Sequence, residues 1–205
     1  MKRPAIALFA RAPVVGRVKT RLIGPLSAEE ACNLHRALVM DAWEALGGAC
    51  IIYTDQEHEE WRRLAGERLR LQRGADLGER MLRCFEEMGA AGFGPLLILG
   101  SDTVGLTPEL LGSWRDREAV LGPAADGGYW AVGCQAPHPG MFEGVEWSSP
   151  ETLAQTVAAM KRCGMVVSFL DTCYDVDTPE DLARLEAEPR VGPRVRAWLA
   201  TWRGL

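Results

Sequence analysis

The chain has 205 residues, of which 47% are hydrophobic and 25% are charged. This balance excludes a disordered or fibrous protein and allows one sizeable domain. Lysine and arginine number 23 and aspartate and glutamate 28, so the formal net charge is -5, which argues against nucleic acid or an anionic membrane as the main partner because both attract a basic excess.

The amino terminus and the cysteines favour a cytoplasmic protein without a membrane span. No apolar run approaches the ~18 residues that a span needs, and the first apolar segment is too short for a secretory signal. The six cysteines are scattered without a Cys-x-x-Cys pair. This pattern predicts reduced, mostly buried thiols and no zinc site.

Short apolar strands alternate with amphipathic helices along the whole chain. In the first half we expect strands at Ala5–Ala10, Ala49–Thr54, Leu69–Gln72 and Pro95–Gly100, with helices at Ser27–Leu46, Glu57–Ala65 and Asp76–Ala91. In the second half we expect strands at Ala119–Leu121, Tyr129–Cys134 and Met165–Leu170, helix starts at Thr107, Ser149 and Thr178, and a last helix at Pro193–Trp202. Caps followed by proline or glutamate mark these helix starts.

This order predicts a mostly parallel α/β sheet with helices on both faces, in a single domain spanning residues 1–205. In such sheets ligands bind beyond the carboxyl ends of the strands. The loops that can carry chemistry are therefore residues 11–21, 101–106, 124–128 and 171–177.

The first of these loops is basic. Arg11, Arg17, Lys19 and Arg21 occur within eleven residues after a buried strand, and Gly16 allows a ligand to approach the backbone closely. Arginine and lysine are natural donors to phosphate oxygens. The loop is predicted to bind phosphate, although it matches neither a Walker motif nor a dinucleotide fingerprint. A solvated basic surface is the alternative.

Two loops offer carboxylates for a divalent metal. Asp102 follows the strongest buried strand, and Asp175 and Asp177 lie two residues apart before a helix. Mg²⁺ prefers one or two carboxylates together with water and phosphate oxygens. We expect Asp102 and one of the other two, preferably Asp177, to converge on one metal. The alternative is that these aspartates only cap turns and helices.

Asp126 is the candidate catalytic base. It lies beside Gly127 and Gly128, where missing side chains would let a substrate lie against the backbone. A plain hairpin turn is the alternative for this loop. Arg80, near the start of a helix, is predicted to add a charge for the nucleotide, and a surface pair with glutamate is its alternative. Trp147 either stacks on a base or sugar or is a buried anchor.

The sequence offers no nucleophile paired with a base. Its three histidines, His35, His58 and His138, are expected to lie away from the strand-end loops. Direct transfer without a covalent enzyme intermediate is therefore predicted.

The same segments resemble the DUF2064 family of uncharacterised bacterial glycosyltransferase-like proteins. The resemblance rests on Leu8–Leu22, Gly74–Met81, Leu121–Tyr129, Phe142–Ser148 and Asp175–Leu182, in family order over nearly the whole chain. That family is similar to 2-phospho-lactate guanylyltransferase and, more distantly, to molybdenum-cofactor guanylyltransferase. The resemblance implies the nucleotide-diphospho-sugar transferase (GT-A) fold, a three-layer α/β/α sandwich.

The resemblance also implies site roles. Residues matching Asp102 and Asp177 hold the divalent metal in related nucleotidyltransferases, and the loop matching Lys19 and Arg21 faces the triphosphate. Val104 departs from the family pattern, in which proline is usual at this position.

We therefore expect a transferase that depends on Mg²⁺ or Mn²⁺, binds a nucleotide or nucleotide-sugar and acts on a small acceptor. Glycosyl transfer from a nucleotide-sugar is the first hypothesis. Nucleotidylyl transfer from a nucleoside triphosphate is the alternative, because four crowded cations suit a triphosphate. A third possibility is a nucleotide-binding module without catalysis. In the catalytic hypotheses Lys19 and Asp126 have catalytic roles, while Arg11, Gly16, Lys19, Arg21, Arg80, Gly127 and Gly128 bind the nucleotide.

Overall fold

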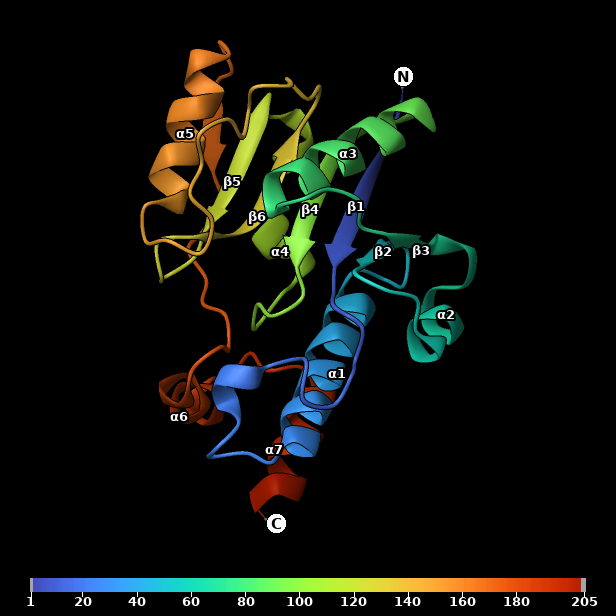
Figure 1. The fold of residues 1–205 in the computed structure, drawn as a ribbon, viewed down its shortest axis with the longest axis vertical. Coiled ribbons are helices and arrows are strands. Elements are labelled where there is room, and N and C mark those ends of the chain that lie inside the picture. The colour runs from blue at the N-terminus through green and yellow to red at the C-terminus, as the bar shows by residue number, and fades with distance from the viewer. Residues whose placement is uncertain (1, 204–205) are drawn as a thin grey trace.

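A seven-stranded sheet runs through the computed structural model, which describes residues 2–203 (Figure 1). The strands are β1 (Arg3–Phe9), β2 (Ile51–Thr54), β3 (Leu69–Leu71), β4 (Phe93–Gly100), β5 (Ala119–Pro123), β6 (Tyr129–Cys134) and β7 (Val167–Phe169). Their order is β3-β2-β1-β4-β6-β5-β7. Strand β6 pairs antiparallel with β4 and β5, and the other pairings are parallel. The predicted mostly parallel sheet is confirmed.

Most helices begin at the expected local signals. They are α1 (Ala28–Ala45), α2 (Glu59–Ala65), α3 (Leu77–Ala90), α4 (Pro108–Leu111), α5 (Thr152–Arg162), α6 (Pro179–Ala187) and α7 (Pro193–Arg203). At the start of α1 the Ser27 hydroxyl accepts from the Glu30 amide at 3.1 Å, and the Ser27 amide donates to the Glu30 carboxylate at 2.7 Å. At α3 the Asp76 carboxylate accepts from the Glu79 amide at 2.8 Å. Both caps satisfy amides that a helix cannot pair internally.

Helices cover both faces of the sheet, which confirms the predicted three-layer sandwich. On one face Leu8 and Ile52 of the sheet pack in one cluster with Val39 of α1 and Trp61 of α2. The other face packs against α3 and α5 through a cluster that includes Ala7, Ile98, Met81, Phe85 and Met160. Buried strands with apolar side chains on both faces are expected for such a sheet.

A third apolar cluster lies beyond the carboxyl ends of the strands. Figure 1 shows α6 and α7 past the arrowheads of β1 and β4, and α7 runs along α1 from Asp41 to Glu30. The cluster combines Leu22 from the basic loop, Val104 from the loop after β4, Leu34, Tyr174, Val176, Leu185 and Val195. Val104 is 3% exposed, so the side chain that departs from the family pattern anchors its loop to the helices by apolar burial.

Several predicted boundaries were wrong by a few residues. Helix α5 begins at Thr152 and not at Ser149, because Ser149 belongs to a turn in which its carbonyl accepts from the Thr152 amide and hydroxyl. Strand β7 has three residues, since Met165 bonds back to Met160 in a turn. All six cysteines are free thiols, and five of them are buried. Within residues 2–203, no helix has the length and apolarity needed to cross a membrane.

Candidate functional site

The ammonium group of Lys19 lies where three strand-end segments meet. The Lys19 backbone is left-handed (φ 49°, ψ 37°), and its side chain is 2% exposed. The Nζ atom lies 2.6 Å from the Val176 carbonyl oxygen, 2.8 Å from Asp102 Oδ2 and 3.2 Å from Asp177 Oδ1. An ammonium carries three N–H donors. These three oxygens use them all, so in this arrangement Lys19 has no donor left for the phosphate that the sequence assigned to it.

Asp102 and Asp177 converge as the strand-end argument predicted. Their oxygens lie 2.8 Å and 3.2 Å from one nitrogen, so they are at most the sum, about 6 Å, apart. The loops that carry them pair with each other: the Val176 amide donates to the Asp102 carbonyl at 3.2 Å, and Thr103 forms an antiparallel bridge with Asp175. We call Lys19, Asp102 and Asp177 the Lys19 cluster.

Asp181, and not Asp177, serves the start of α6. The Asp181 Oδ2 atom accepts from the Asp177 amide at 3.0 Å, the Thr178 amide at 2.7 Å and the Thr178 hydroxyl at 2.9 Å. The capping role that the sequence allowed for Asp177 is therefore filled by its neighbour. The Asp177 carboxylate is left to face Lys19 and Arg21.

The charges of the Lys19 cluster stabilise one another. Burial favours the neutral form of Asp102, but the Lys19 ammonium outweighs it and holds the pKa of Asp102 well below its usual range. Burial likewise opposes the charge on Lys19, and the Asp102 and Asp177 carboxylates outweigh it and raise the pKa of Lys19. Lys19 and Asp102 are therefore both charged at neutral pH.

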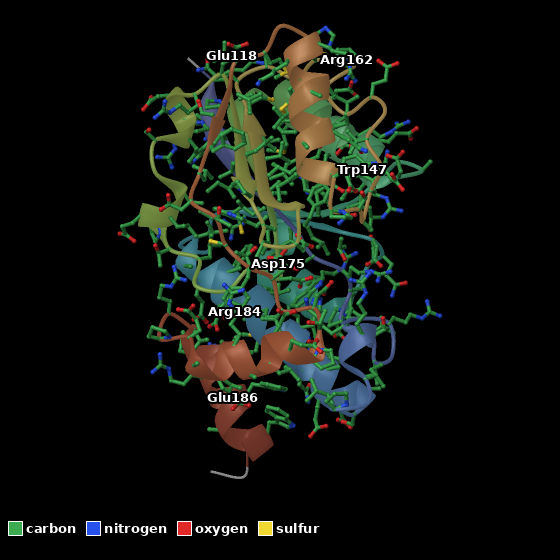
Figure 2. The ribbon with its side chains drawn as sticks, turned by 90° about the vertical axis from the view of Figure 1, so that its left-hand side faces the viewer. Glu118, Trp147, Arg162, Asp175, Arg184 and Glu186 are labelled. Atoms are coloured by element: carbon green, nitrogen blue, oxygen red, sulfur yellow. The ribbon has the colours of Figure 1, made fainter. Side chains whose placement is uncertain are left out.

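Asp175 faces the same edge but has a different partner. Its Oδ1 atom accepts from the Thr103 hydroxyl at 2.9 Å. Burial, followed by the negative charge of Asp102, raises the pKa of Asp175 to about 6. Figure 2 shows Asp175 between the sheet and Arg184 of α6. The ionised form of Asp175 is thus disfavoured in the folded state, whereas the ionised form of Asp102 is stabilised.

Asp175→Asn should stabilise the protein at neutral pH. A folded pKa of about 6 against an ordinary value of 3.8 means that this group costs stability progressively as pH rises from about 4 to about 6. Asparagine keeps the acceptor for Thr103 and removes the charge. Chemical denaturation in EDTA should show a gain of about 1–2 kcal/mol at pH 7.5 and little at pH 4. Asp171→Asn, an exposed control, should show no gain, and an equal gain at both pH values would refute the charge explanation.

His35 lies directly behind the site, contrary to the expectation for the histidines. Its Nε2 atom is 2.9 Å from the Arg11 carbonyl oxygen, which also accepts from Trp61 Nε1 at 2.9 Å. Its Nδ1 atom lies 3.8 Å from Asp102 Oδ1. The ring is 3% exposed. Sequence spacing placed His35 on the buried face of α1 but could not show that this stretch of α1 packs under the loop after β4.

The cations of the basic loop differ in their surroundings. Arg11 and Arg21 have side chains that are 67% and 68% exposed, and Arg17 is exposed as well. Arg21 Nη1 lies 3.3 Å from Asp177 Oδ2, so it touches the Lys19 cluster from outside. Gly16 has φ +75°, and the space where a side chain would stand is open. Glycine suits this position because of its backbone conformation and not because of close packing. Three arginines thus remain accessible to an anion.

Asp126 lies on a loop tied to the same edge. The Ala125 amide donates to the Cys173 carbonyl at 3.0 Å. The Asp126 Oδ1 atom accepts from the Gly128 amide at 2.9 Å, and Asp126 is an exposed residue. Its charge contributes to the raised pKa of Asp175. The structure therefore gathers Asp126 and the Lys19 cluster at one end of the sheet.

Gly127→Ala should destabilise this loop strongly. Gly127 has φ +89°, and a Cβ atom there would lie 2.1 Å from the Pro150 carbonyl oxygen. Backbone cannot move aside easily, so we expect a loss of about 2–4 kcal/mol in the free energy of unfolding. Gly128→Ala is the matched control, because the nearest atom to its Cβ would be an oxygen at the end of the Asp126 side chain, at 3.2 Å, and not backbone. Equal small losses in denaturant titrations of the two variants would contradict this account.

Arg80 and Trp147 contact other groups than the Lys19 cluster. Arg80 Nε donates to the Gly74 carbonyl at 3.2 Å. Trp147 packs edge-on against Phe142, with ring centroids 6.0 Å apart. A Cβ atom on Gly78 would lie 2.6 Å from the Trp147 ring, so glycine at this position lets the indole rest on α3. Of the two roles considered for Trp147, the structure shows the packed anchor.

Asp102 and Asp177 could supply only part of the ligands of a metal ion. Within residues 2–203, no group of three or more His, Cys, Asp or Glu side chains is arranged to hold a metal ion. Asp102 and Asp177 have side chains that are 36% and 48% exposed, and so both can be reached from solvent. Two accessible carboxylates fit Mg²⁺, which usually keeps water and phosphate oxygens among its ligands.

Comparison with solved structures supports the fold. A candidate nucleotide-diphospho-sugar transferase from Desulfovibrio desulfuricans G20 is 27% identical in sequence and superposes with a TM-score of 0.86. The match covers 100% of this chain and 96% of that chain. A cytidylyltransferase from Leptospira borgpetersenii is 12% identical, with a TM-score of 0.54 and coverage of 100% and 95%. The inositol-1-phosphate CTP transferase of T. maritima is 14% identical, with a TM-score of 0.52 and coverage of 98% and 96%.

Sequence comparison identifies the family. The search of curated proteins gives no match. Residues 39–149, more than half of the chain, match the family described as an uncharacterized protein conserved in bacteria, DUF2064. This family match and the structural similarity to the Desulfovibrio protein both agree with the resemblance that the motifs show. The chain therefore belongs to the DUF2064 family and has the nucleotide-diphospho-sugar transferase fold.

Proposed function

We propose that the protein is a metal-dependent transferase that uses a nucleotide-activated donor. The observation that carries the proposal is the convergence of Asp102 and Asp177 beside an accessible basic loop, at the carboxyl end of a parallel sheet. Carboxylates and arginines in one place suit a phosphate group with a divalent cation. The description of the Desulfovibrio protein as a candidate nucleotide-diphospho-sugar transferase supports the same class.

Asp102 and Asp177 would hold Mg²⁺ or Mn²⁺, which when bound neutralises the charge that develops on a phosphate leaving group. Lys19 now fills the space between the two carboxylates with a single positive charge. A divalent cation beside them would repel its ammonium. Lys19 would then turn its N–H donors to the phosphates of the donor, as the sequence assigned. Arg11, Arg17 and Arg21 would bind those phosphates from the solvent side.

Glycosyl transfer from a nucleotide-sugar is the first form of the proposal. Two observations favour nucleotidylyl transfer from a nucleoside triphosphate as the second candidate. Three exposed arginines follow β1, and this number of cations suits the larger charge of a triphosphate. The residue two positions after Asp102 is the buried, apolar Val104, so this position offers no second carboxylate for a metal.

Asp126 is the proposed general base for the acceptor hydroxyl. Asp126 is exposed, and its side chain is held by a hydrogen bond from the Gly128 amide. Asp126→Asn should therefore lower turnover at least ~100-fold while changing donor affinity less than ~3-fold. Asn at this position keeps the acceptor for that amide. Steady-state kinetics and calorimetry on the same variant would separate the two effects, and a parallel loss of affinity and turnover would assign Asp126 to donor binding instead.

The donor class can be identified by thermal stabilisation. Nucleoside triphosphates and nucleotide-sugars would be screened with Mg²⁺ and with EDTA, and one donor should raise Tm by several degrees in Mg²⁺ and less in EDTA. Product analysis with acceptor mixtures then separates the reactions, because glycosyl transfer releases a nucleoside diphosphate and nucleotidylyl transfer releases pyrophosphate. Stabilisation that is the same in Mg²⁺ and EDTA would instead indicate a binding module without metal-dependent catalysis.

A further inference from the structure

The amino-terminal half of β1 borders a cavity at the opposite end of the sheet. Strand β2 begins opposite Ala7, so residues 3–6 of β1 have no neighbouring strand on that side (Figure 1). A cavity of 460 Å³ fills this gap, within the size range of small-molecule sites. Pro4, Ala5 and Ile6 line it, whereas the Lys19 cluster lies past the end of β1. The two places are roughly 15 Å or more apart along the strand.

The cavity is lined mainly by apolar side chains and by three arginines, which are exposed residues. The apolar lining includes Ile6, Leu46, Ile51, Met88, Phe93 and Trp114. Three arginines line it against one acid, Glu87, and the Glu87 carboxylate already accepts from the Tyr53 hydroxyl at 3.2 Å. The lining therefore has a surplus of two positive charges in a chain whose net charge is -5.

The three arginines are held by groups that leave their charge unneutralised. Arg68 lies over the Trp43 ring at 5.2 Å, and Arg115 lies over the Trp114 ring at 5.5 Å. Arg70 donates to the Leu69 carbonyl at 2.9 Å. Aromatic faces and carbonyls orient a guanidinium without cancelling its charge as a carboxylate would. The N–H donors not used in these contacts are available to an anion.

We propose that this cavity binds an amphipathic organic anion, with its apolar body against β1 and its carboxylate, sulfonate or phosphate at the arginines. The apolar wall accounts for the body and the unneutralised guanidiniums account for the charge. The site is independent of the proposed transferase reaction, because it shares no residue with the Lys19 cluster.

Decanoate is a suitable probe, since it joins a ten-carbon body to one carboxylate. Titration calorimetry should give one saturable site per chain, with decanol binding at least ~10-fold more weakly. Arg70→Gln and Arg115→Gln should each weaken decanoate about 10-fold. Arg83→Gln, an exposed arginine on α3 outside the cavity lining, is the matched control and should leave affinity unchanged. Equal affinity for decanol and decanoate would overturn the assignment of the arginines.

A second variant tests the cavity itself. Ala49 is an exposed residue at its wall, so Ala49→Trp should fill the space without disturbing the core and abolish decanoate binding. Retained binding in this variant would place the ligand elsewhere and overturn the proposal. Co-flotation with phosphatidylglycerol vesicles distinguishes a lipid headgroup from a free anion. Vesicle binding without saturable decanoate binding would show a basic surface instead of a ligand cavity, and would also overturn it.

Discussion

Replacing Lys19 by methionine should destabilise the protein, and Mg²⁺ should restore much of the loss. The substitution removes the one ammonium that lies between Asp102 and Asp177. Breaking a fully buried ion pair costs about 3–5 kcal/mol, but these carboxylates are 36% and 48% exposed, so we expect about 2 kcal/mol. A divalent cation would neutralise the same oxygens. Denaturation with and without Mg²⁺ measures both effects.

The control for this experiment is Arg21→Gln, which removes a neighbour of Asp177 from the solvent side. Its side chain is 68% exposed, so the change should cost less than about 1 kcal/mol and show no special response to Mg²⁺. Sodium chloride at the same ionic strength excludes simple screening. If Mg²⁺ stabilises the methionine variant no more than the wild type, the space between the two carboxylates is not a metal site.

Asp102→Asn should remove the dependence of donor binding on the metal. Asparagine has nearly the same size as aspartate, but it lacks the charge that favours a divalent cation. We expect donor affinity in Mg²⁺ to fall about 100-fold, or about 2.7 kcal/mol, while affinity in EDTA changes less than ~3-fold. Titration calorimetry in the two buffers gives both values.

The paired control for that variant is Asp171→Asn, which removes a carboxylate from the same strand-end segment but outside the Lys19 cluster. It should bind the donor as the wild type does in both buffers. A fall of equal size in Mg²⁺ and EDTA for Asp102→Asn would mean that Asp102 serves the loop structure and not a metal. Stability of each variant, measured in parallel, separates binding effects from unfolding.

Helix starts and strand-end loops were predictable because their signals are local. Ser27 with Glu30 and Asp76 with Glu79 satisfy helix amides within four residues, and such contacts can be read from spacing alone. The convergence of Asp102 and Asp177 followed from a general property of parallel sheets. It also required the segment after β7 to cross back towards β4, as the bridges of Cys173 to Ala124 and of Asp175 to Thr103 show.

Other parts of the site depend on contacts between distant segments. His35 was placed correctly on a helix but wrongly away from the loops, because nothing in its neighbourhood shows that α1 extends past the sheet. The third apolar cluster, which makes this possible, joins Leu22, Val104 and Val195 from three distant parts of the chain. The sequence also could not show that Asp181, and not Asp177, caps the start of α6, since either carboxylate has suitable spacing.

Asp102 and Asp177 should together hold a divalent metal when a nucleotide donor is bound. Crystals grown with Mn²⁺ and the donor that gives the largest thermal shift would locate the metal by its anomalous scattering. We expect one peak within direct coordination distance of a carboxylate oxygen of each aspartate and of a phosphate oxygen of the donor, with the Lys19 ammonium displaced towards the phosphates. Bound donor with no metal peak at these carboxylates, and Lys19 still between them, would contradict it.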